Sequence, residues 1–174
     1  MKLTEHFTKE ELIYSATAIK YKLSNEPPLV HEGTLKHTCK YLLEPLRALL
    51  NIKYVGRIIN NKVVKKVIIN VTSGYRSLAV NQALKKEGFH PSDKSQHCSD
   101  EAADIEAVLI FIDNSKQVLN YKALFEDIKD FVSSGVLSVD QCIQEKDGSA
   151  QWVHVSYSIL GAEKNRKDFK ILTL

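Results

Sequence analysis

The sequence has few cysteines, and their placement excludes two common uses of the residue. Its 174 residues include only Cys39, Cys98 and Cys142, an odd number with no close spacing. This pattern argues against a disulfide framework and against a CxxC metal knuckle. Free thiols are typical of a reducing compartment, so we expect the protein to be made in the cytoplasm.

Long hydrophobic runs are also absent from the sequence. No apolar stretch approaches the length that a transmembrane helix needs, and we therefore expect no membrane span. No apolar stretch of signal-peptide length follows the first residues, Met1 to His6. Any action on a cell wall would then follow lysis of the cell or another route of export.

An excess of one charge is missing as well. The 24 basic and 21 acidic residues leave a net charge of +3, and the basic residues are scattered. Nucleic-acid-binding domains gather their cations on one face, so we do not expect a nucleic acid as partner. The length and an ordinary hydrophobic content of 44% predict a single domain over residues 1–174. We expect this domain to be a monomer.

Helices are expected mainly in the first part of the chain. A capping box predicts a short helix over 8–19. Leucines at helical spacing predict a long helix over 35–50, with a kink at Pro45. A serine cap and a further apolar pattern predict helices over 78–86 and 121–133.

Strands dominate the later part of the chain. Turn residues at Asn60-Asn61 and at 146–149 separate runs of β-forming residues and predict two hairpins. Strands are expected over 54–59, 63–71, 102–112, 141–145, 151–158 and, at a sheet edge, 168–174. This order predicts an α+β fold, in which helices pack on one side of a mostly antiparallel sheet.

Two short segments about fifty residues apart contain a candidate set of metal ligands. His97 and Asp104 come from the first segment, and His154 comes from the second. Two imidazoles and one carboxylate suit a catalytic zinc ion, because three protein ligands leave a fourth position for water. Taken singly, each of these residues is more often a hydrogen-bonded core or turn residue. The prediction therefore depends on whether the three side chains converge.

These segments resemble a known family. Their pattern is similar to that of the zinc D-alanyl-D-alanine carboxypeptidase family. The resemblance lies in Ser-x-His-x6-Asp followed by Trp-x-His, with Ser-Gly-Tyr-Arg-Ser upstream at 73–77. That family includes phage endolysin peptidases and is related in fold to the hedgehog signalling domain. The resemblance runs from Leu3 to Tyr157 and implies a hedgehog-like, D,D-peptidase-like fold. It also implies hydrolysis of amide bonds in peptidoglycan stem peptides, by a D,D-carboxypeptidase or a lytic endopeptidase.

The resemblance further implies roles for individual residues. His97, Asp104 and His154 would hold Zn²⁺, which would polarise the scissile carbonyl and activate water. Arg76 would lie near the metal, where its planar guanidinium binds a substrate carboxylate or stabilises the developing oxyanion. A structural ion pair is the alternative for Arg76.

Two more residues are candidates for binding substrate. Ser95 would hydrogen-bond the substrate or the loop that carries the zinc ligands, and a cap or turn role is an equal alternative. Trp152 would line the cleft, and a place in the core is its alternative.

One position departs from the family pattern. Members commonly carry an acid three residues before the last histidine, and this acid moves a proton from water to the leaving amine. Here that position is Gln151, which cannot titrate and is kept as a substrate-binding candidate. Glu145 is the expected substitute base, because pairing of Lys146 with Gln151 would place it opposite Trp152 on the side of the ligand histidine. A one-residue slip would turn it away, and Glu101 is the second candidate.

This departure leaves a second class of function open. With Gln151 in place of the acid, the chain could be a catalytically weak or inactive zinc-containing module that binds cell wall or forms part of a phage particle. A second departure is Asp100, where the family usually has glycine. Glycine there indicates a left-handed backbone conformation, which aspartate tolerates better than most residues.

Overall fold

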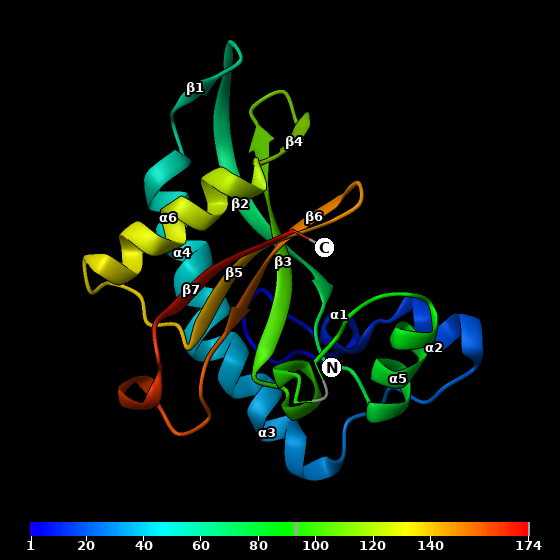
Figure 1. Ribbon diagram of the computed structural model, residues 1–174. Coiled ribbons are helices and arrows are strands. Elements are labelled where there is room, and N and C mark those ends of the chain that lie inside the picture. The colour runs from blue at the N-terminus through cyan, green and yellow to red at the C-terminus, as the bar shows by residue number, and fades with distance from the viewer. Residues whose placement is uncertain (93, 174) are drawn as a thin grey trace.

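The structure, a computed structural model, describes residues 1–92 and 94–173 and has an α+β fold built on a curled, mixed sheet (Figure 1). The sheet has seven strands in the order β1-β2-β3-β6-β5-β7, and β4 pairs with β3 beyond the stretch that pairs with β6. The strands are β1 (Ile58–Ile59), β2 (Lys62–Ser73), β3 (Ala102–Phe111), β4 (Lys116–Val118), β5 (Gln141–Asp147), β6 (Ala150–Ser156) and β7 (Asp168–Thr173). The α-helices are α1 (Lys9–Ile13), α2 (Ala16–Tyr21), α3 (Leu29–Thr38), α4 (Glu44–Tyr54), α5 (Leu78–Lys86) and α6 (Tyr121–Ser133). Three short turns of other helix types are η1 (Cys39–Leu43), η2 (Gln96–Ser99) and η3 (Ala162–Lys164).

The last strand makes the sheet mixed, so the expectation of a mostly antiparallel sheet is met only in part. β7 lies at the edge, as expected, but runs parallel to β5, with Asp168 beside Gln141. β6 ends at the end of the sheet where β5 begins, and the chain stays at that end as it passes through η3. β7 therefore starts level with β5 and follows it in the same direction. The other strand pairs are antiparallel.

The hydrophobic core lies between one face of the sheet and the helices α4 and α6. Alternate residues of β3 point into it, and Ile105 and Leu109 are fully buried there. α4 contributes Leu46 and Leu50, and α6 contributes Ile128, all of them without exposed surface. Because side chains alternate along a strand, the residues between them face the opposite side of the sheet.

The N-terminal helix is divided in two, which corrects the expectation of one helix over 8–19. The predicted capping box is present, with Thr8 and Glu11 bonded reciprocally. α1 ends at Ile13 because Tyr14 adopts an extended conformation, and the side chain of Ser15 then caps α2. The break gives the chain a turn that becomes one wall of the cleft described below.

The long helix is continuous in direction but changes type at the predicted kink. η1 is a π-helical turn just before Pro45, where the backbone N–H of Glu44 bonds to the carbonyl oxygen of Cys39. Proline has no N–H to offer, and the wider turn accommodates the missing bond. α4 then continues to Tyr54, so the expectation that a strand begins at residue 54 was wrong. None of the helices in the described ranges is long and apolar enough to cross a bilayer.

Candidate metal centre

Three elements bring His97, Asp104 and His154 together. β3 and β6 pair so that Asp104 lies directly beside His154, and both alternate with core residues and therefore face away from the core. The turn η2 carries His97 and ends at Asp100, whose φ of 62° places it in the left-handed region predicted for this position. This turn reverses the chain into β3 and folds His97 over the other two side chains.

The donor atoms of these residues form an equilateral triangle. His97 Nε2, Asp104 Oδ1 and His154 Nδ1 each lie 3.1 Å from the other two. Bonds of about 2.0–2.1 Å to a tetrahedral metal place neighbouring donors about 3.3 Å apart, close to this spacing. All three side chains are buried. In the described part of the chain, no other three His, Cys, Asp or Glu side chains gather in this way.

The positions of the protons favour a cation at this triangle. His97 Nδ1 lies 2.6 Å from the carbonyl oxygen of Gly74, so this nitrogen carries the proton and donates it. Nε2 of His97 then presents a lone pair, as does Asp104 Oδ1. A single proton on His154 Nδ1 cannot satisfy both acceptors, whereas a divalent cation satisfies all three donor atoms at once. The set therefore fits a divalent transition metal and forms a candidate metal-binding triad.

The electrostatics keep His97 and Asp104 in the protonation states that a metal requires. Burial lowers the pKa of His97, and nearby Arg76 lowers it further, against the opposing effect of Asp104. Burial alone would raise the pKa of Asp104, but His97, His154 and Arg76 outweigh it and hold that pKa well below its usual range. Asp104 is therefore ionised at neutral pH, and His97 is neutral, as metal ligands must be.

Arg76 lies beside the triad and is tied to it from two sides. Its Nη2 donates to Asp104 Oδ2 at 2.8 Å, and its Nε donates to Ser73 Oγ at 3.0 Å. Its backbone N–H also bonds to the carbonyl oxygen of His97. The guanidinium has five N–H donors, so these contacts leave others to bind a ligand.

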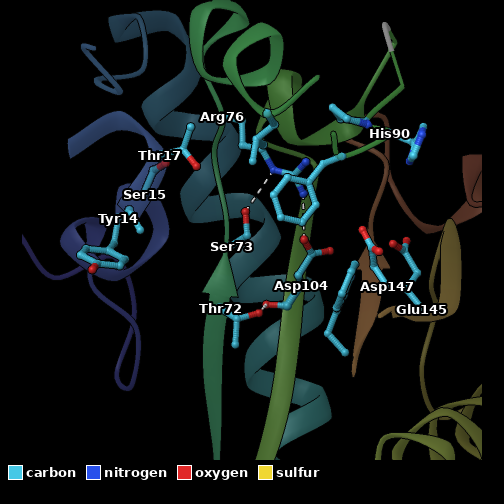
Figure 2. A pocket seen from close by; sticks show the side chains of 15 residues that line it. Tyr14, Ser15, Thr17, Thr72, Ser73, Arg76, His90, Asp104, Glu145 and Asp147 are labelled. Carbon is cyan, nitrogen blue, oxygen red and sulfur yellow. Dashed lines mark hydrogen bonds and ion pairs between the residues drawn. The ribbon is translucent and has the colours of Figure 1, made fainter. Parts of the chain in front are cut away.

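Asp104 connects the triad to a cleft, which we call the first cavity, and it is the member of the triad that lines this cleft. The volume of the cleft is about 340 Å³, and Asp104 and Arg76 lie at its centre (Figure 2). Tyr14 and Thr17, from the break between α1 and α2, line one side. Glu145 of β5 lies on the other side. A ligand in this cleft would thus meet hydroxyl groups on one side and a carboxylate on the other.

Glu145 lies where the hairpin register was predicted to place it. Lys146 pairs with Gln151, and Glu145 therefore lies opposite Trp152. Burial raises the pKa of Glu145, and the negative charge of Asp104 raises it further. A carboxylate with a raised pKa is a stronger base than an ordinary glutamate, which suits it to accept a proton from water.

No protein-family model matches the chain, and no curated protein or solved structure matches it significantly either. The interpretation of the site therefore depends on its own geometry and chemistry.

Other predicted site residues lie elsewhere. Gln151 is exposed and faces away from the first cavity, because it alternates with Trp152 along β6. It lines a second cavity of about 560 Å³, which Trp152 and Thr72 share with the first. Ser95 precedes η2 without a side-chain capping bond, and it lines neither of these cavities.

Sequence reasoning missed two residues that line the first cavity. Asp147 stands two positions after Glu145 on the same strand, so the period of the strand could have identified it. His90 is exposed but lies at the cavity wall. It comes from the loop after α5, and no spacing rule relates that loop to β3.

Proposed function

We propose that the protein is a zinc metallopeptidase of the D-alanyl-D-alanine carboxypeptidase type, with a hedgehog-like fold, that hydrolyses amide bonds in peptidoglycan stem peptides. The observation that carries this proposal is the equilateral triangle of donor atoms beside Arg76 at the base of a cleft. Two imidazoles and one carboxylate are the ligand set of several catalytic zinc sites, and they leave one position for substrate or water. The motif resemblance at residues 73–77, 95–104 and 152–154 supports the same family.

The residues of the cleft have separate tasks in this proposal. His97, Asp104 and His154 would hold zinc, which when bound would supply Lewis acidity at the scissile carbonyl. Arg76 is already fixed by Ser73 and Asp104, and its remaining N–H groups bind the substrate carboxylate or the oxyanion that develops during attack. Because its guanidinium is held in place before substrate arrives, little reorganisation is needed during the reaction.

Glu145 is the proposed proton carrier. Its carboxylate accepts a proton from the attacking water and delivers it to the nitrogen of the leaving amine. Its raised pKa makes the first transfer easier than it would be to an ordinary glutamate, because a carboxylate with a higher pKa is a stronger base. Gln151 cannot perform this task, since it does not titrate and faces the second cavity.

The decisive experiment combines metal analysis with a digest of peptidoglycan. We expect about one zinc ion per chain, and we expect His154→Gln to lose it. The matched control His6→Gln should keep the zinc ion, because His6 pairs with Glu44 outside the cleft. We also expect release of D-alanine or of peptide fragments from peptidoglycan, abolished by a chelator and restored by zinc. A protein that binds no metal at the triad would contradict the whole proposal.

A second candidate function is favoured by the exposed amide of Gln151. If zinc binds at the triad but neither D-alanine nor fragments are released, the chain is better described as a zinc-containing module that binds cell wall or belongs to a phage particle. Binding to insoluble peptidoglycan without turnover would support this alternative.

A further inference from the structure

The second cavity adjoins the candidate metal centre. Thr72 and Trp152 line both cavities, so the two spaces meet at these side chains. The second cavity is lined by β2 and β3, by the segment that leads into α6, and by the tip of the β5–β6 hairpin. A ligand bound at Asp104 therefore lies next to the second cavity, with Thr72 and Trp152 at the boundary.

The second cavity exists because β3 changes its neighbour at this point. β6 pairs with β3 only as far as Ile105, and β4 begins its pairing at Val108. Between these positions, Glu106 has no strand partner on that side. The hairpin tip diverges here, and the sheet is notched next to the site.

The lining of the notch mixes apolar and polar side chains, and one of them is a carboxylate with no partner in the described part of the chain. Glu106 is half-buried and makes no side-chain hydrogen bond or ion pair with any residue that the structure describes. Gln151 and Tyr121 add an amide and a hydroxyl group around it. A half-buried carboxylate gains most from a ligand that carries an ammonium group or several N–H donors.

We propose that the notch is a second substrate subsite, in which Glu106 binds an amino group of a peptide that continues past Trp152. This inference rests on the proposed function and deepens it, because a peptide that fills both cavities is recognised beyond the residues that lie next to Asp104 and Arg76. It also assigns Gln151 a place in substrate binding that does not involve proton transfer.

Trp152 provides a direct readout, because it is the only tryptophan of the chain and borders both cavities. Its fluorescence is titrated with D-Ala-D-Ala, with the same dipeptide extended by lysine at either end, and with the extended peptides after acetylation of the lysine amine. We expect one lysine-extended peptide to bind about tenfold more tightly than the dipeptide, and acetylation to remove most of that gain. Hydrolysis of the same peptides by the zinc-loaded protein is measured in parallel.

Glu106→Gln should remove the same preference for the free amine, whereas Glu126→Gln, an exposed acid of α6 outside both cavities, should keep it. The acetylated peptides test the idea on the unaltered protein, so the result does not depend on folding of a variant. Equal affinity for free and acetylated peptides would overturn the second subsite, even if D-Ala-D-Ala is cleaved. Tighter binding of the amine without any hydrolysis would support the subsite and contradict the peptidase.

Discussion

Gly74 allows α1 to approach the segment between β2 and α5, and its carbonyl oxygen bonds to His97. Gly74→Ala should therefore disrupt both this packing and the candidate metal site. An added Cβ at this position would lie 2.2 Å from the carbonyl oxygen of Leu12, whereas ordinary contacts begin near 3.4 Å. The obstacle is backbone, so the two segments must separate by about 1.2 Å. That movement would also break the 2.7 Å hydrogen bond from Tyr75 N–H to the same oxygen.

The expected loss of stability follows from these two effects. Overpacking costs about 1–3 kcal/mol and a lost hydrogen bond about 1 kcal/mol, which together give about 2–4 kcal/mol. In a chain of this length, the midpoint of thermal unfolding should fall by about 5–15 °C. The carbonyl of Gly74 also orients His97, so the affinity for zinc should fall by about 10- to 100-fold.

Two measurements check this prediction. Thermal unfolding of the metal-free protein gives the change in stability, and competition with a chromophoric chelator gives the dissociation constant for zinc. Gly33→Ala is the matched control, because no atom lies within 4 Å of its added Cβ and alanine favours the helix α3. Gly33→Ala should be neutral or more stable by up to about 1 kcal/mol. If Gly74→Ala unfolds at the same temperature and binds zinc equally well, the close packing of α1 against this segment is refuted.

Three further predictions concern other parts of the molecule. The hydrogen bonds from Arg166 hold the pKa of Asp140 at about 2, which is below its value in the unfolded chain. The stability that these bonds confer is therefore present above about pH 4 and is lost as the pH falls through 2. Asp140→Asn should therefore cost about 1–2 kcal/mol at pH 7, with the difference narrowing between pH 4 and 2 in urea unfolding; a constant difference would contradict this. Tyr54→Phe removes a 2.6 Å hydrogen bond to Asp127 and should lower stability by about 1–2 kcal/mol in thermal unfolding, and unchanged unfolding would show that the bond contributes nothing. Glu145→Gln should slow hydrolysis by about 10²- to 10⁴-fold without changing the zinc content. It should also abolish the fall in activity at acid pH that protonation of Glu145 causes, and burial shifts the pKa of that protonation upwards. A variant that keeps this fall in activity would eliminate Glu145 as the base.

Local signals in the sequence were sufficient for many elements. The cap at Ser77 and the amphipathic period over 121–133 predicted α5 and α6 with their observed bounds. Asn60 and Asn61 both adopt positive φ values, as the predicted hairpin turn requires. These features depend on a few neighbouring residues, which is why the sequence reveals them.

Features that depend on distant contacts were harder to predict. Nothing in 168–173 distinguishes a parallel from an antiparallel edge strand, because the direction of β7 is decided by the path of the chain after β6. The convergence of the triad was predicted from motif resemblance, and the alternation along β6 correctly placed Trp152 on the side of His154. The same alternation turns Gln151 away from the candidate metal site and towards the notch. The notch forms because β4 replaces β6 as the neighbour of β3, and no local sequence pattern indicates this change.

The parallel pairing of β7 has a consequence for synthesis of the protein on the ribosome. β5 and β6 are neighbours in sequence and can pair as soon as both have emerged, but the outer edge of β5 has to wait for residues 168–173. During that interval an unpaired strand edge is exposed, together with Phe125, whose ring later stacks edge-on against Phe169. Shortening the chain from its C-terminal end should therefore promote aggregation of the nascent protein before it affects the distant metal ligands.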